Sequence, residues 1–204
     1  MIKLLDILDS KDSYYRINFF NTLSGLRSVW MAGSQNNEGI KNLGLFNSIV
    51  HVGSNPPLVG IVFRPQTVPR HTLDNIYSCG YFTLNSITQD MIDLAHRTSE
   101  KFAAHEDEFN ILGFTPFYFE ERPDVPAVAE SPVKILLRFR ENHLITSNQT
   151  IFIVSEIINV VLSDEKGINA DGSINHDFYN HTVISGLNDY YAIEFQKSMF
   201  DKRK

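Results

Sequence analysis

The sequence predicts a mainly β protein with short helices, folded as an antiparallel barrel. Stretches rich in β-branched and aromatic residues recur along the chain, and the helical stretches between them are short. Strands and helices also do not alternate in the regular rhythm of parallel α/β proteins. Because 204 residues can bury one sizeable core, we expect a single domain over residues 1–204, with a lead-in at 1–15 and a tail at 196–204.

The first half of the chain carries most of the turn signals. We expect, in chain order, an amphipathic lead-in at 1–11, a helix at 14–23, strands at 28–33, 46–52 and 58–63, a helix at 72–78 and a strand at 81–85. Gly25 ends the first helix, and the polar residues 35–39 form the turn of a hairpin. The second helix takes Thr72 as its N-cap and ends before Gly80.

The second half of the chain holds the longest strand candidates. We expect short helices at 89–97 and 106–112, strands at 133–139 and 151–162, a polar loop at 164–176 and a last strand at 190–195. The acids of 106–108 suit the N-terminus of a helix, where the dipole favours negative charge. The strand at 151–162 is rich in Ile and Val, which favours burial inside the sheet.

The charge of the chain is distributed unevenly. The formal net charge is −6, yet residues 39–73 contain no Asp or Glu, and residues 13–73 hold five basic residues against one acid. An acidic protein with one local basic region lacks the broad basic face of a nucleic-acid-binding protein. The acid-free segment instead indicates a local site for an anionic small molecule.

Other sequence features limit the compartment and the chemistry. Cys79 is the single cysteine, so no intramolecular disulfide forms, and its place beside Gly80 indicates a structural role. The N-terminal residues are interrupted by acids too early for a signal peptide, and no apolar run reaches membrane-spanning length. We expect a cytoplasmic protein with no membrane partner. The seven histidines show no metal-ligand spacing, so no metal is expected.

The acid-free segment closes with Arg70-His71-Thr72, directly before a predicted helix. An arginine fork, a hydroxyl and the first helical N–H groups together suit a phosphate. Arg64 precedes them by one strand end and brings a second guanidinium. The alternative is an N-cap preceded by a solvated arginine, and spacing alone favours this alternative slightly.

A second polar group of residues lies earlier in the same segment. Asn42, Asn47 and Ser48 offer two amides and a hydroxyl that could bind the edge of a flat heterocycle. The alternative is that they only form turns, which is the commoner role of asparagine. The chain has no nucleophile elbow, P-loop or Gly-rich dinucleotide fingerprint. Any chemistry would therefore be carried by a bound cofactor that the protein positions.

The order of these motifs resembles the flavin reductase-like (flavoredoxin-type) family of FMN-binding split barrels. The resemblance spans roughly residues 16–195. The matching stretches, in order, are 42–48, 53–58, Arg64-Pro65, 70–76, 80–85, Thr98-Ser99, Glu108-Phe109, 113–115 and 130–132. The chain departs from the commoner Ala-Pro pattern of the family by having Gly44-Leu45, and glycine there permits close backbone approach.

The resemblance implies a Greek-key split β-barrel, a homodimer and an FMN cofactor near the subunit interface. It implies that Asn42, Phe46, Asn47 and Ser48 lie along the isoalloxazine and ribityl chain. Arg70, His71 and Thr72 would meet the phosphate with Arg64 close by, and Ser34, Thr98 and Ser99 are further candidates. No catalytic side chain is implied, because the flavin carries the chemistry.

The function that follows is an FMN-binding oxidoreductase, reduced by NADH or NADPH, that passes electrons to a small-molecule acceptor or a protein. A rival class is an electron carrier or flavin-binding sensor without NAD(P)H activity. A third is a split barrel that has lost flavin and binds haem or acts as a scaffold. The polar residues at Asn47-Ser48 and Arg70-His71-Thr72 match the flavin-binding positions of the family, which argues against a split barrel that has lost its flavin.

Overall fold

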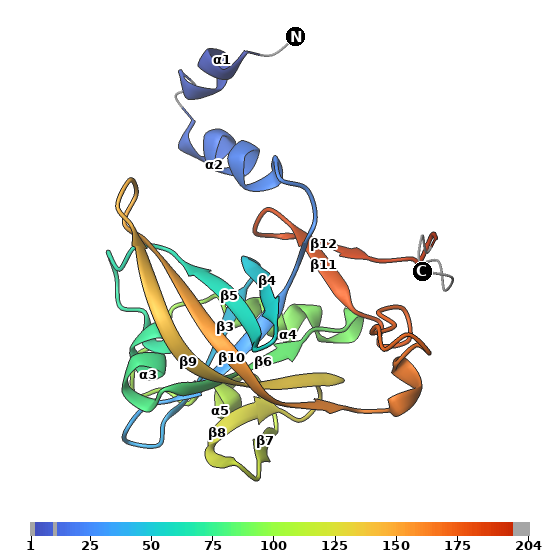
Figure 1. The fold of residues 1–204 in the computed structure, drawn as a ribbon. Coiled ribbons are helices and arrows are strands. Elements are labelled where there is room, and N and C mark those ends of the chain that lie inside the picture. Colours follow the sequence, from blue (N-terminus) through green and yellow to red (C-terminus); the bar gives the residue numbers. More distant parts are fainter. Residues whose placement is uncertain (1–2, 10–11, 198–204) are drawn as a thin grey trace.

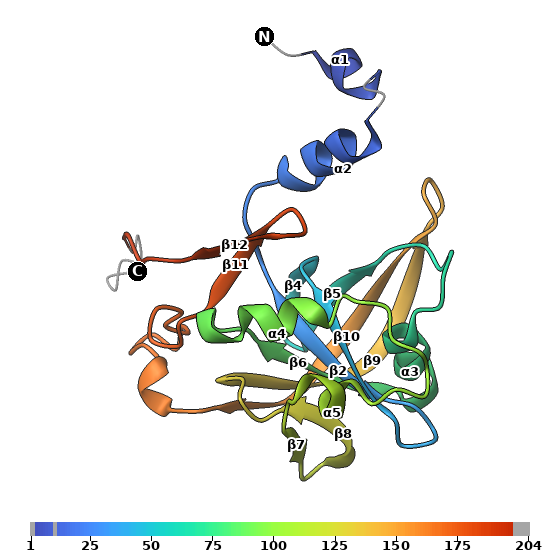
Figure 2. The same cartoon turned by 180° about the vertical axis from the view of Figure 1, so that it is seen from behind.

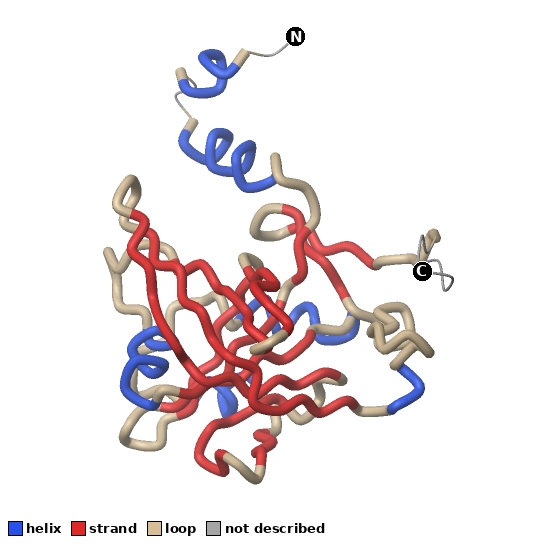
Figure 3. Tube along the Cα trace, viewed as in Figure 1, coloured by secondary structure: helices blue, strands red, loops and turns tan. Residues whose placement is uncertain are grey.

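The computed structural model describes residues 3–9 and 12–197, and its centre is one curled antiparallel sheet (Figures 1 and 3). Seven strands form it in the order β3-β2-β6-β9-β10-β5-β4. They are β2 (Trp30–Gln35), β3 (Lys41–Phe46), β4 (Ile49–Ser54), β5 (Pro57–Phe63), β6 (Tyr81–Ser86), β9 (Val133–Ile145) and β10 (Thr150–Leu162). The predicted mainly β architecture with short helices is thus confirmed.

The predicted hairpin at the start of the sheet is confirmed. β2 and β3 pair antiparallel, with Trp30 opposite Phe46 and Gln35 opposite Lys41. The turn between them contains Gly39 at a φ of +82°, a conformation that glycine adopts without strain. The strands expected at 58–63 and 81–85 are also present as β5 and β6.

The single strand expected at 46–52 is wrong. β3 ends at Phe46, β4 begins at Ile49, and Asn47 and Ser48 lie between them. β3 and β4 are the two edge strands of the sheet, so the chain leaves one edge and enters the other at these two residues. The apolar run conceals this break because Phe46 and Ile49, the residues on either side of it, are both apolar and half-buried.

Helix α3 (His71–Cys79) lies against β2 and β3, and its start differs from the prediction. Arg70 is the N-cap and no side chain caps the helix, so Thr72 as N-cap is wrong. The Thr72 hydroxyl is buried and donates a hydrogen bond to Oδ1 of Asn42 at 2.7 Å. At the other end Gly80 adopts φ +75° and ends the helix as predicted.

The two later helices are confirmed with small shifts. The helix expected at 89–97 consists of a 3-10 turn, η1 (Gln89–Met91), followed by α4 (Ile92–Arg97). The next, α5 (Glu108–Leu112), begins after Asp107, whose carboxylate accepts from the N–H of Asn110. Contacts of α5 with β3 place its first residues beside the polar end of that strand.

The N-terminal residues form an arm that stands away from the barrel (Figures 1 and 2). It contains α1 (Leu4–Leu8) and α2 (Ser13–Thr22), the second matching the helix expected at 14–23. No residue of α2 is buried. Parts of the expected lead-in, and the expected tail from residue 198 onward, lie outside the described residues.

Two small sheets and a short turn complete the structure. One is the hairpin of β7 (Pro116–Phe119) and β8 (Arg122–Val128), which the sequence does not predict. The other begins with the pairing of β1 (Arg27–Ser28) and β11 (Thr182–Ser185), which is likewise not predicted. The last strand, β12 (Asp189–Ala192), pairs with β11 and ends before the predicted residue 195. The loop expected at 164–176 holds a 3-10 turn, η2 (Glu165–Gly167).

The hydrophobic core lies on both faces of the curled sheet. One cluster includes Ile61, Phe82 and Ile153 and packs α3 against the sheet. Another includes Met31 and Phe109 and packs α4 and α5 on the β2–β3 hairpin. α3 and α5 therefore both contact β3. Polar side chains of the two helices meet at Asn42 on that strand. None of the helices in the described ranges is long and apolar enough to cross a membrane.

Candidate functional site

The start of α3 has the features of an anion site. Arg70 is half-buried, and its buried Nε has no hydrogen-bond partner among the described residues. No side chain caps the helix, so its first N–H groups are available to a ligand. Arg64 follows the end of β5 and is exposed, while His71 is half-buried. A buried guanidinium N–H without an acceptor fits a phosphate oxygen.

Directly behind this helix start lies a buried polar network between three elements. Asn42 on β3 is its centre: its Oδ1 accepts from the hydroxyls of Thr72 at 2.7 Å and Ser34 at 3.2 Å. The Ser34 hydroxyl in turn accepts from Nδ2 of Asn75 at 3.1 Å. Ser34 is fully buried and the other three are at most 8% exposed. Three of the predicted site residues, Ser34, Asn42 and Thr72, therefore lie together in the structure. Their side chains form hydrogen bonds mainly with one another.

Glu108 closes the network from α5. The amide Nδ2 of Asn42 donates to its Oε1, and the backbone N–H of Leu43 donates to Oε2 at 3.0 Å. Burial, opposed by these two hydrogen bonds, raises the pKa of the Glu108 carboxyl to about 7. The orientation of the Asn42 amide is therefore fixed on one side by Glu108 and on the other by Thr72 and Ser34.

A cavity of about 200 Å³ opens beside this network. Asn42, His71 and Asn75 line it on one side. Three acids also line it, namely Asp74, Glu106 and Glu108. Carboxyl groups repel a phosphate, so the lining of this cavity does not favour one.

Asn75 and Glu108 belong to the network but are absent from the predicted site residues, although both lie in stretches that match the family. Asn75 follows Thr72 by three residues, the spacing that places both on one face of a helix. In the sequence Glu108 stands at a predicted helix start, where the helix dipole alone explains an acidic residue. Its contact with β3 spans more than 60 residues of sequence, and no local pattern reports such a contact.

Gly44 allows α3 to lie close to β3. A Cβ at this position would stand 2.8 Å from Oγ1 of Thr72 and 2.9 Å from Cε2 of Phe46, closer than side-chain carbons approach such atoms. The Phe46 ring packs on Phe63 with centroids 4.8 Å apart. The departure from the Ala-Pro pattern therefore has a structural reason, the close approach of strand, helix and ring.

Asn47 and Ser48 occupy the break between the two edge strands. Nδ2 of Asn47 donates to the carbonyl of Gly186 at 2.7 Å, which ties the barrel edge to the turn between β11 and β12. The Ser48 hydroxyl donates to Oδ1 of Asn47 at 3.4 Å. Both side chains are half-buried, and they lie on a different element from the Asn42 network.

Thr98 and Ser99 are not joined to the other candidates by hydrogen bonds. The Thr98 hydroxyl donates to the carbonyl of Ala95, and the Ser99 hydroxyl donates to that of His96, both at 2.7 Å. Both hydroxyls thus bind the last turn of α4.

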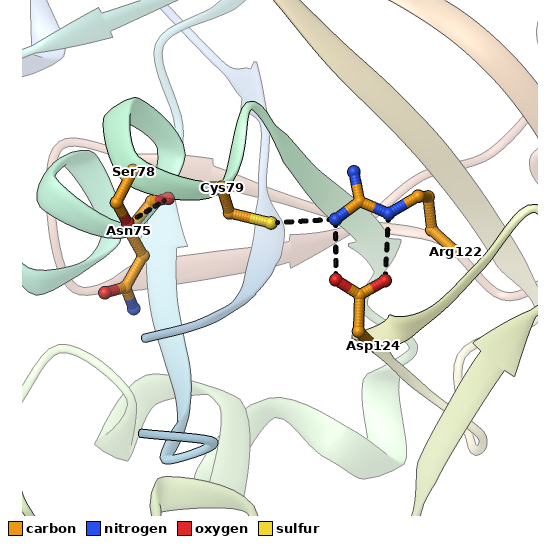
Figure 4. A network of polar contacts seen from close by, with 5 residues as sticks. All are labelled: Asn75, Ser78, Cys79, Arg122 and Asp124. Carbon is orange, nitrogen blue, oxygen red and sulfur yellow. Dashed lines mark hydrogen bonds and ion pairs between the residues drawn. The ribbon is translucent and has the colours of Figure 1, made fainter. Parts of the chain in front are cut away.

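Cys79, at the end of α3, points toward Arg122 and Asp124 (Figure 4). Its thiol accepts from Nη2 of Arg122 at 3.2 Å, and the same guanidinium holds Asp124 through two bonds of 2.8 and 2.6 Å. The Arg122 guanidinium also stacks over the Tyr81 ring at 4.0 Å. The contacts fit the structural role predicted for this cysteine, which helps to join α3 to β8.

The curled sheet is a split barrel, the fold of flavin reductases to which this chain is similar. The flavin reductase like domain matches residues 26–176, which is most of the chain, and the chain belongs to this family. No curated protein matches it.

Solved structures agree with the family. A Shewanella frigidimarina NCIMB 400 protein, assigned as a flavin reductase with a split barrel domain, superposes with a TM-score of 0.92 at 33% identity over 98% of both chains. Flavoredoxin of Desulfovibrio vulgaris (Miyazaki F) gives 0.74 at 24% identity, over 88% of this chain and 93% of that one. The NADH:FAD oxidoreductase of Streptomyces globisporus C-1027 gives 0.69 at 13% identity, over 91% and 96%. The last two show the fold alone.

Proposed function

We propose that this flavin reductase-like protein binds FMN with its phosphate at the start of α3. The observation that carries the proposal is the buried, unpartnered Nε of Arg70 beside an uncapped helix N-terminus. Arg70 would supply a charged fork, and the N–H groups of His71 and Thr72 would complete the cradle. Thr72 contributes its backbone, because its hydroxyl already donates to Asn42. Arg64 adds a second positive charge from the end of β5.

The flat ring and the ribityl chain would lie along the end of β3 and the break before β4. Phe46, Asn47 and Ser48 are half-buried there, so part of each side chain can meet a ligand. Asn42 and Ser34 would act from behind by holding Thr72 in place. Thr98 and Ser99 would shape the end of α4 without touching the phosphate.

A bound flavin would supply the redox chemistry, namely the uptake of a hydride from NADH or NADPH and electron transfer to a small-molecule acceptor. The residues of the chain bind and orient the cofactor, and none needs to act as a dedicated base. The rival function is an electron carrier or flavin sensor without NAD(P)H activity. One solved structure of this fold is an NADH:FAD oxidoreductase, so FAD is the alternative cofactor for the site.

We also propose that the protein is a homodimer in the cytoplasm. The support for a dimer is the N-terminal arm, whose helices expose large apolar side chains. These are Leu4, Leu5, Leu8, Tyr14, Tyr15, Ile17 and Phe20, each at least 41% exposed. α2 has no buried residue, and a short helix without a buried face is not stable alone in water, so a second copy that covers the arm would stabilise it.

The test is anaerobic absorption spectroscopy with FMN and FAD titrations. We expect saturable FMN bands that bleach on adding NADH or NADPH, and bands that persist until a chemical reductant is added would favour the carrier. Arg70→Ala should weaken FMN binding by about 1.5–3 kcal/mol, the contribution of a charged hydrogen bond. Arg97→Ala is the matched control, because Arg97 pairs with Glu100 on the surface of α4. Equal FMN affinities of the parent and Arg70→Ala would show that the phosphate does not bind at the start of α3.

A further inference from the structure

Glu108 is a buried carboxyl without a counter-ion in the part of the chain that the structure describes. Its side chain is 4% exposed, and no ion pair between the described residues includes it. Lys41 lies on β3 as well, but its Nζ pairs with Asp107 at 2.5 Å. Glu106 and Asp107 add negative charge close by. When Glu108 is ionised, its charge is therefore stabilised by hydrogen bonds and not by a cation.

Hydrogen bonds connect this carboxyl to the start of α3. Oε1 of Glu108 accepts from Nδ2 of Asn42, and Oδ1 of Asn42 accepts from the Thr72 hydroxyl at 2.7 Å. Thr72 is the second residue of α3, and its backbone N–H is one of the groups proposed to hold the FMN phosphate. Glu108 also lines the same cavity as His71, the first residue of α3. The path from the carboxyl to the helix start thus passes through one side chain, that of Asn42.

A negative charge on Glu108 would repel a phosphate bound at this helix start. Asn42 and Thr72 are each 8% exposed, so the two charges interact through the protein interior, where water and salt screen weakly. A proton on Glu108 removes this repulsion. The N–H groups of Asn42 and Leu43 keep their acceptor, because a protonated carboxyl still has acceptor capacity. Protonation therefore changes the charge beside the helix start and leaves the network connected.

Both charge states of Glu108 are populated near neutral pH. Burial is the largest cause that raises the pKa of its carboxyl to about 7, and the hydrogen bonds from Leu43 and Asn42 oppose it. The charges of Asp107 and Glu106 raise this pKa further. The charged and titratable groups around Glu108 are Lys41 on β3, His71 and Asp74 on α3, and Glu106 and Asp107 before α5.

We propose that Glu108 takes up a proton when FMN binds, so that the affinity for FMN falls as the pH rises and Glu108 ionises. This inference rests on the proposed function, because it needs the phosphate at the start of α3. Linkage is reciprocal: the factor by which ionised Glu108 weakens FMN binding is also the factor by which bound FMN weakens the acidity of Glu108. Riboflavin, which lacks the phosphate, should bind without this effect.

The test measures Kd for FMN and riboflavin from about pH 5.5 to 8.5 in the parent and in Glu108→Gln. Glutamine is neutral at every pH, so the ratio of the parent's Kd to the variant's isolates the charge of Glu108. Titrations that both proteins share, such as that of the FMN phosphate, cancel in this ratio. We expect it to rise about five- to tenfold across the range for FMN and to stay flat for riboflavin. Glu38→Gln, exposed in the turn after β2, should follow the parent.

A ratio that is flat for FMN, or that rises equally for riboflavin, would overturn the inference. Arg70→Ala separates the two possible failures. Weaker FMN binding in Arg70→Ala together with a flat ratio refutes only the role of Glu108, whereas unchanged FMN binding in Arg70→Ala refutes the phosphate site itself and the inference with it.

A second measurement needs no variant, in case Glu108→Gln does not fold. Carbon NMR of the parent, labelled with ¹³C at the glutamate carboxyls, follows Glu108 as the carboxyl that titrates with a pKa of about 7. Saturating FMN should raise this pKa, and saturating riboflavin should leave it in place. A pKa that FMN does not change would show that Glu108 and the phosphate are not coupled.

Discussion

Glu108 illustrates at the scale of one residue how strongly the fold changes a side chain. In the sequence it is one of three acids at a helix start, all equally suited to the dipole. In the structure it alone of the three is buried, 4% exposed, and it holds both the amide of Asn42 and the N–H of Leu43. The raised pKa follows from this burial, and so does a pH dependence of stability.

The free energy of unfolding should fall as the pH rises from 4.5 to 7 on account of Glu108. The carboxyl has a pKa of about 7 when folded and 4.5 as its ordinary value, so the folded state holds the proton more tightly in this window. The stabilisation is complete below pH 4.5 and lost above 7, a change of about 3 kcal/mol at ~1.4 kcal/mol per unit.

The measurement is urea unfolding across this pH range for the parent and Glu108→Gln, which cannot titrate. The parent should lose stability relative to the variant as pH rises. Glu100→Gln, at an exposed position, serves as the control and should run parallel to the parent. Parallel curves for the parent and Glu108→Gln would show that Glu108 does not titrate in this window.

At the scale of elements, the contact between β3 and α3 depends on Gly44. Gly44→Ala should lower the free energy of unfolding by about 1–3 kcal/mol, the cost of an overpacked interface, because the new methyl group overlaps Thr72 and Phe46. Gly53→Ala is the matched control, since a Cβ there stands 3.4 Å from the nearest atom. Chemical denaturation gives the free energy of unfolding of both variants. Equal losses in Gly44→Ala and Gly53→Ala would mean that β3 and α3 can move apart without cost.

Strands with a clear apolar pattern were predicted from sequence, and those fixed by distant contacts were not. β5 and β10 carry continuous apolar runs and were found. The β7–β8 hairpin was missed because prolines such as Pro123 and Pro126 argue against strands, although a two-stranded sheet at the surface accepts them. β9 continues past Phe139 through exposed polar residues, where pairing with β10 alone keeps it extended.

The candidate site was predicted in part for the same reason. Arg70 and Thr72 were visible because a helix start follows an acid-free segment directly. The break at Asn47 was not visible, since its partner Gly186 lies 139 residues further along the chain. The N-cap was misassigned because the rule that places threonine at N-caps does not include a buried acceptor such as Asn42.

At the scale of the whole molecule, the N-terminal arm sets the expected oligomeric state. Replacing Ile17 and Phe20 together by glutamate should convert a dimer into a monomer, because charges on α2 oppose burial against a second copy. Light scattering after size-exclusion chromatography gives the mass directly. Tyr118→Glu, at the exposed position of β7, is the control and should leave the mass unchanged. A parent that is already monomeric would refute the dimer.

The sequence by itself determined the antiparallel barrel, the helix start at Arg70 and the flavin reductase-like resemblance, because each rests on local patterns of apolar, turn and capping residues. Only the tertiary structure decided what surrounds them. Lys41 lies in the acid-free segment, yet the fold pairs it with Asp107 at 2.5 Å, and the acids of α5 come to face β3. Electrostatic interaction and burial depend on distance in space, and the chain brings together residues that its order keeps apart.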